Sequence, residues 1–155
     1  GRSRRWSDLG VVIPGVRDDR IVLVSRQSSS GTYEFFRQHA LGNEDFRLGS
    51  RGLNGSKEVV ELVAVTPTAI GYSGMGYATR AVKMLRVSAE AGAPAVAPTV
   101  DAVHDGRYPL ARSLHLYTLG EPEGAVAGYV EWILSPGGQK VVADSGYVPN
   151  PPPQP

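Results

Sequence analysis

The sequence predicts an α/β fold. Short apolar runs rich in β-branched residues alternate along the chain with segments whose apolar side chains recur at helical spacing. The composition is typical of a chain that can bury a core, since 41% of the 155 residues are hydrophobic and 20% are charged. No run approaches the roughly 18 apolar residues that a membrane-spanning helix needs.

The first half of the chain predicts three strands and two helices. The strand before residue 26 reads RIVLVS, a β-branched apolar run typical of a buried strand. The second helix is preceded by Asn-Gly-Ser, which offers a cap for its first turn. Strands are expected at residues 20–25, 69–73 and 82–87, and helices at residues 32–41 and 57–65.

The second half predicts one more strand followed by helices. Pro136 is favoured at the first position of a helix, because its missing N–H would be unpaired there in any case. We expect a helical turn at residues 99–104, a strand at 113–119, and helices at 124–134 and 135–143. Residues 149–155 form a Pro-rich tail, which is expected to be extended.

Charge and residue usage exclude several classes of site. With 16 basic and 15 acidic residues the formal net charge is +1, which argues against a nucleic-acid-binding surface. The chain has no cysteine, so a disulfide framework and a thiolate metal site are excluded. His39, His104 and His115 lie far apart in sequence and predict no metal site.

The turn between the first strand and the first helix carries the most informative chemistry. It reads Arg-Gln-Ser-Ser-Ser-Gly-Thr, from Arg26 to Thr32. A helix that opens at the carboxyl end of a strand presents unpaired N–H groups and a partial positive charge, which suit an oxyanion. Gly31 permits close approach, Ser30 and Thr32 add hydroxyl donors, and Arg26 adds a charged planar fork. A helix cap beside a surface arginine explains the same residues equally well.

Five segments, in order, resemble the periplasmic phosphate-binding proteins of bacterial ABC transporters. The run SRQSSSGTYEFF resembles their Arg-x-x-x-Ser-Gly-Thr segment. Together the segments extend from residue 6 to residue 149, nearly the whole chain. The other four lie at residues 6–8 (WSD), 54–78 (NGSKEVVELVAVTPTAIGYSGMGYA), 108–112 (YPLAR) and 132–149 (WILSPGGQKVVADSGYVP).

The resemblance implies a particular architecture. Residues 1–148 are expected to form a lobe of the type II periplasmic-binding-protein class, with a mixed sheet flanked by helices. Within it, residues 8–107 correspond to the family's second lobe. Residues 108–148 correspond to the return strand and C-terminal helices, which pack on the first lobe in the family. The segment that forms most of the first lobe is expected to be missing from this sequence.

The resemblance also implies a function. The family binds inorganic phosphate without a metal or cofactor, and its second-lobe ligands fall on Arg26, Ser30, Gly31 and Thr32, with Ser29 in support. The first lobe supplies the other ligands, among them an aspartate that accepts the phosphate proton. This chain is therefore expected to hold half of the site. The implied partners are an ABC permease in the cell envelope and either the first lobe or a second copy of the chain.

Three alternatives remain open from the sequence. The same turn is suited to another oxyanion, such as sulfate, molybdate or tungstate. The lobe is also suited to a non-transport role as an envelope or interaction module, which the Pro-rich tail favours. A phosphate-ester hydrolase is disfavoured, because the sequence presents no base, nucleophile or metal cluster, and we expect no enzymatic activity.

Overall fold

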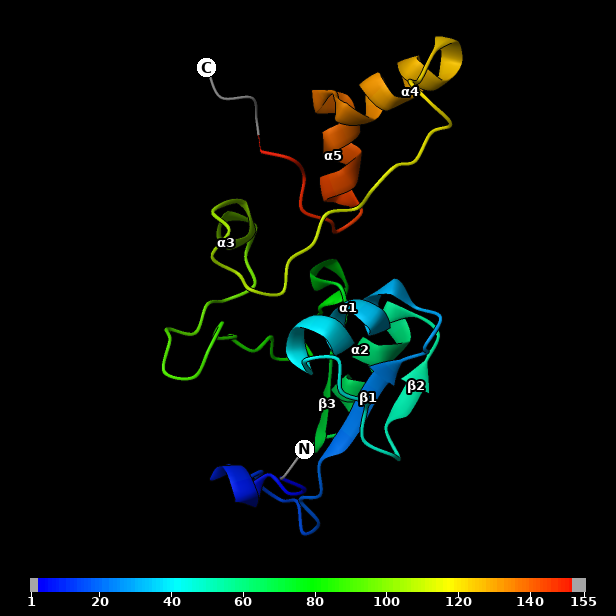
Figure 1. Ribbon diagram of the computed structural model, residues 1–155. Helices are drawn as coiled ribbons and strands as arrows, with labels where there is room; N and C mark the ends of the chain where they lie inside the picture. The colour runs from blue at the N-terminus through cyan, green and yellow to red at the C-terminus, as the bar shows by residue number, and fades with distance from the viewer. Residues whose placement is uncertain (1–2, 152–155) are drawn as a thin grey trace. The chain divides into compact units, whose positions relative to one another are not determined.

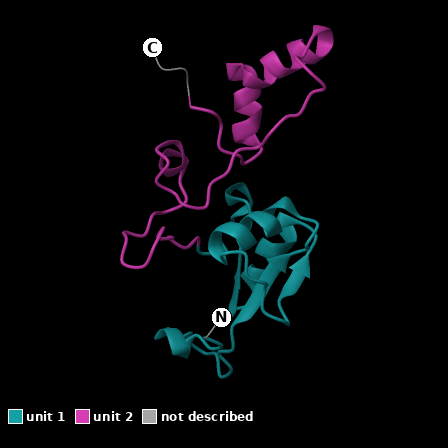
Figure 2. Cartoon of the chain, viewed as in Figure 1, with its two compact units in different colours: residues 1–83 teal, residues 84–155 magenta. Residues whose placement is uncertain are grey.

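The structure is a computed structural model that describes residues 3–151 (Figure 1). The chain divides into two compact units, residues 1–83 and residues 84–155 (Figure 2). Residues 152–155 of the predicted tail lie outside the described residues. The two units are described separately below.

Unit 1 is built on a parallel sheet, which confirms the predicted α/β class. The strand order is β2-β1-β3, with β1 (Val22–Arg26) in the centre between β2 (Arg51–Leu53) and β3 (Ala69–Gly71). Both pairings are parallel, so the sheet of the described residues is not the mixed sheet that was expected. Parallel neighbours need crossover connections, and α1 (Gly31–Ala40) and α2 (Ser56–Val65) supply them.

The core of unit 1 lies between α2 and the sheet. Val59 is 1% exposed and Val24 of β1 is 2% exposed. Gly71 of β3 permits this close packing, because a Cβ at that position would lie 3.0 Å from Val59 Cγ1 and 3.1 Å from the Val24 carbonyl oxygen. The face of α2 that carries Val59 therefore packs against β1 and β3.

The N-terminal segment is attached to the same unit by polar contacts. It contains the 3-10 turn η1 (Ser7–Leu9) and forms an antiparallel bridge between Arg5 and Arg20. The Trp6 indole N–H donates to the Thr68 carbonyl oxygen at 2.9 Å. The Asp19 carboxylate accepts from the Ser7 N–H at 2.9 Å and from Arg5 Nη1 at 2.7 Å.

Unit 2 contains three helices, and no strand is assigned among its described residues. The helices are α3 (Val100–His104), α4 (Gly124–Leu134) and α5 (Pro136–Asp144). Ser135 separates α4 from α5, and its hydroxyl accepts from the Gly138 N–H at 3.3 Å while donating to the Trp132 carbonyl at 2.6 Å. All three helices agree with the sequence prediction to within one residue.

Two predicted strands are absent. Residues 82–87 form only a single antiparallel bridge, between Val87 and Val96. Residues 113–119 are exposed throughout and pair with no neighbour among the described residues. An extended apolar run becomes a strand only where the backbone N–H and C=O groups of a neighbouring strand hydrogen-bond to its own. The short strand β2 and the turn η2 (Met75–Tyr77) were not predicted.

Within residues 3–151, no helix combines the length and the apolar character needed to cross a lipid bilayer.

Candidate functional site

The predicted site residues come together where β1 ends and α1 begins. Arg26 is the last residue of β1, and Ser30 is the N-cap of α1. The turn between them is closed by a hydrogen bond from the Ser30 N–H to the Gln27 carbonyl at 2.9 Å. Ser29, Gly31 and Thr32 belong to this same turn and helix start, so the whole predicted set occupies one edge of the sheet.

The amide groups at the start of α1 are only partly used. The Thr32 N–H donates to the Ser30 hydroxyl oxygen at 3.2 Å, which is the N-cap contact. The Glu34 N–H donates to the Ser30 carbonyl at 3.2 Å. Among the described residues, the N–H groups of Gly31 and Tyr33 have no acceptor. Two donors of a ten-residue helix therefore remain open to a ligand.

The Arg26 guanidinium is hydrogen-bonded by two residues at the start of α2. Nη1 donates to the Ser56 hydroxyl and Nη2 to the Asn54 carbonyl, both at 2.7 Å. Nε is buried without a partner among the described residues. A guanidinium carries five N–H donors. Two are used here, so three remain.

The contacts of Arg26 follow from the sheet order. β2 is the parallel neighbour of β1, and Arg26 is in register with Leu53. Asn54 comes directly after Leu53, and Ser56 begins α2 two residues later, at the same carboxyl edge. Sequence reasoning had assigned these residues to a helix cap alone, because the β1–β2 pairing was not visible without the structure.

Tyr72 is a residue of the site that the sequence analysis missed. Its hydroxyl contacts the Ser25 hydroxyl at 2.7 Å and accepts from the Arg26 N–H at 3.2 Å. Its ring stacks on Phe36 of α1, with centroids 4.0 Å apart and planes 6° apart. Tyr72 follows β3 immediately, so its place after a strand parallel to β1 was the available signal. It links the end of β1 to α1.

The electrostatics of this edge favour an anion. The N-termini of α1 and α2 both begin there, and each adds partial positive charge to that of Arg26. The nearby carboxylates are engaged: Glu34 pairs with Arg37 at 2.8 Å, and Glu58 accepts from the Gly55 N–H at 3.3 Å. Within the described residues, no three metal-ligating side chains come together. The arrangement is suited to hold a small oxyanion by hydrogen bonds.

Known proteins resemble the chain over nearly its whole length. The sequence profile of the PBP superfamily domain matches residues 1–136. The phosphate-binding protein PstS of Pseudomonas aeruginosa is 36% identical over 152 residues, which cover 96% of this chain and 47% of that protein. PstS of Bacillus subtilis is 33% identical over 150 residues, which cover 96% of this chain and 46% of that protein.

A solved structure resembles the fold. It is described as a phosphate ABC transporter substrate-binding protein from Clostridium perfringens with bound phosphate. The TM-score is 0.79 and the sequence identity 27%, and the match covers 97% of this chain and 58% of that one. The chain thus spans about half the length of the curated relatives that it matches.

Proposed function

The chain belongs to the family of the PBP superfamily domain, and from that membership we propose that it binds inorganic phosphate as part of the solute-binding component of an ABC uptake system. The relatives that carry this activity by name are about twice as long as the chain. The proposed role is to bind phosphate in the cell envelope without catalysing a reaction. The proposed partner of the whole protein is an ABC permease.

The observation that carries the proposal is the group of unused donors at one edge of the sheet. The open amides of Gly31 and Tyr33 lie at the start of α1, and Arg26 at the end of β1 keeps three of its five N–H donors. We propose that phosphate sits on the α1 N-terminus, held by Arg26, Ser30, Gly31 and Thr32. Ser29 supports it from the turn.

On this proposal Arg26 contacts the anion through the Nη N–H groups that Ser56 and Asn54 leave unused. Its buried Nε has no acceptor, and such a group costs about 1–3 kcal/mol. An incoming oxyanion accepts charge-assisted hydrogen bonds, while the Asn54 and Ser56 contacts hold the guanidinium in position.

The remaining ligands are proposed to come from a first lobe. We propose that residues 8–107 act as the second lobe and that residues 108–148 pack either on the first lobe or on a second copy of the chain. The support is the apolar surface of unit 2, where Tyr117 is 89% and Leu119 fully exposed. Half a site leaves the anion in contact with water, so phosphate binding to this chain alone is expected to be weak.

Calorimetric titration of the chain with phosphate, sulfate and molybdate tests the proposal. We expect weak, saturable phosphate binding that Arg26→Ala abolishes. Arg80→Ala is the matched control, because it removes the same charge from an exposed position outside the turn. Phosphate binding that survives Arg26→Ala, or equal loss in both variants, would contradict the proposed site. A preference for sulfate or molybdate would contradict the proposed ligand.

A further inference from the structure

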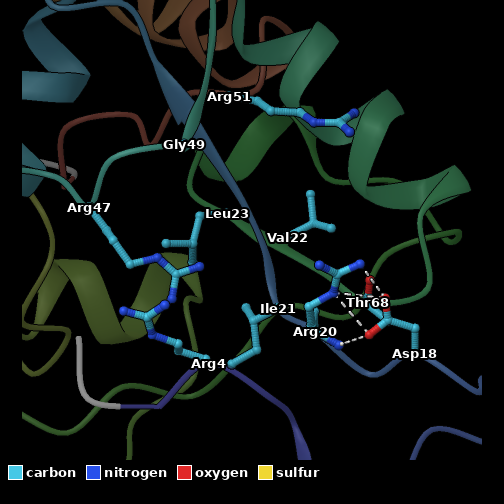
Figure 3. A pocket seen from close by; sticks show the side chains of 10 residues that line it. All are labelled: Arg4, Asp18, Arg20, Ile21, Val22, Leu23, Arg47, Gly49, Arg51 and Thr68. Atoms are coloured by element: carbon cyan, nitrogen blue, oxygen red, sulfur yellow. Dashed lines mark hydrogen bonds and ion pairs between the residues drawn. The ribbon is translucent and has the colours of Figure 1, made fainter.

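A second basic site lies at the end of the sheet opposite Arg26 (Figure 3). There, a cavity of about 390 Å³ is lined by residues from the start of β1 and from the segments that lead into β2 and β3. The three strands are parallel, so these segments meet at one edge. Val22 and Arg26 bound β1, and at about 3.3 Å per residue the two edges lie about 13 Å apart.

The lining concentrates positive charge. Four arginines and one aspartate give a formal charge of 4 − 1 = +3, whereas the whole chain carries +1. Asp18 pairs mainly with Arg20, since Asp18 Oδ2 lies 2.6 Å from Arg20 Nη2 and 2.8 Å from Arg20 Nε, and its Oδ1 also lies 3.5 Å from Arg5 Nη1. The other three arginines of the lining do not pair with Asp18. They are Arg4, Arg47 and Arg51.

Those three guanidinium groups have no carboxylate partner among the described residues. Figure 3 shows the side chains of Arg4 and Arg47 extending toward one another beside Leu23, whereas Arg51 is directed away from them. Two like charges that share one cavity repel each other unless an anion lies between them. A guanidinium also presents a planar fork that fits two phosphate oxygens at once.

From these observations we propose that the cavity binds linked phosphates, such as pyrophosphate or tripolyphosphate, between Arg4 and Arg47. Two guanidinium forks that extend toward one another suit an anion with two linked phosphate groups, one for each fork. Thr68, which is buried, lines the same cavity on the side of Asp18 and Arg20. This site is separate from the Arg26 turn and does not rest on the function proposed there.

The test is a calorimetric titration of the full chain with pyrophosphate, tripolyphosphate and citrate at low ionic strength, where charge attraction is least screened. Four proteins are compared: wild type, Arg47→Ala, Arg4→Ala and Arg80→Ala. We expect pyrophosphate and tripolyphosphate to bind, and each pocket variant to weaken that binding by about ten-fold or more, since one charge-assisted contact is lost. Arg80→Ala, which lies outside the cavity, should bind as wild type does.

Arg26→Ala separates this site from the proposed phosphate site. It should leave pyrophosphate binding unchanged, and Arg47→Ala should leave orthophosphate binding unchanged. The proposal is overturned if no linked phosphate binds, if Arg80→Ala weakens binding as much as Arg47→Ala, or if Arg26→Ala alone removes it. Citrate binding as tightly as pyrophosphate would overturn the assignment to phosphates. Circular dichroism of each variant excludes loss of the fold as the cause.

Discussion

At the scale of single residues, the site depends on side chains that hold Arg26 in place. The Tyr72 hydroxyl hydrogen-bonds to both the Arg26 N–H and the Ser25 hydroxyl. The Ser56 hydroxyl and the Asn54 carbonyl accept from the Arg26 guanidinium. Ser25 is buried, at 4% exposure, so the Tyr72 contact also satisfies a polar group that water does not reach. These residues position the arginine and need not touch the anion themselves.

The Asp19 carboxylate makes the attachment of the N-terminal segment depend on pH. Hydrogen bonds from Ser7 and then from Arg5 lower the pKa of Asp19 from its ordinary value of 3.8 to about 2. The folded-state pKa is thus depressed, so the stabilisation is complete above about pH 4 and is lost as the pH falls through about 2. Because Asp19 ties the N-terminal segment to the start of β1, we expect that segment to detach over this window.

Trp6 fluorescence measures this detachment in a Trp132→Phe background. Emission should stay constant from pH 7 to about 4 and change between about 4 and 2. Asp19→Ala should show the detached signal already at pH 7, whereas Asp45→Ala, an exposed carboxylate elsewhere in unit 1, should follow the parent protein. A parent transition well above pH 4, or an Asp19→Ala variant that matches the parent at pH 7, would contradict the assignment.

At the scale of elements, we expect the close contact between α2 and the sheet to contribute to the stability of unit 1. Gly71 lies where a Cβ would press on the Val24 carbonyl oxygen and on Val59. We expect Gly71→Ala to lower the free energy of unfolding by about 1–3 kcal/mol, because backbone atoms cannot move aside as a flexible side chain does. Urea unfolding followed by Trp6 fluorescence, again with Trp132→Phe, measures the change.

Gly52→Ala is the matched control on the other edge strand. Its new Cβ would meet the Arg26 carbonyl oxygen at 3.8 Å, an ordinary van der Waals distance. A change within about 0.5 kcal/mol is expected there. If both variants lose the same free energy, the loss reflects glycine in a strand in general, and the close packing at Gly71 is not its cause.

The elements that sequence reasoning predicted are those with a local signal. Helices α4 and α5 follow apolar spacing and Pro136, and β1 follows its β-branched run. The predictions of strands at 82–87 and 113–119 are wrong, because strand pairing depends on a neighbouring strand that no local sequence pattern reveals. The same reason hid β2, and with it the place of the Arg26 guanidinium. The turn itself was predicted correctly, since cap and glycine signals are contiguous in sequence.

At the scale of the whole molecule, the family resemblance drawn from five segments is confirmed by the profile match and by the relatives. Unit 2 exposes many apolar side chains in the described residues. Tyr129 and Trp132 are each at least half exposed on α4, as are Leu114, Leu116, Tyr117 and Leu119 before it. Such a surface favours association in water.

Light scattering over a range of protein concentrations tests this expectation. The chain should associate as its concentration rises, and Tyr117→Ser with Trp132→Ser should reduce association without changing unit 1. A monomer at every concentration, with Trp132 shielded from a quencher in solution, would show that the apolar surface is covered within the chain. That result would contradict a docking role for unit 2.

The central claim is that phosphate binds on the free amides of α1 beside Arg26. Amide chemical shifts from a ¹H–¹⁵N correlation titration with phosphate test it most directly, because each N–H reports its own hydrogen bond. We predict that the largest shifts fall on Gly31 and Tyr33 and disappear in Arg26→Ala. Shifts centred on the Arg4 and Arg47 pocket, or spread evenly over the chain, would contradict the claim.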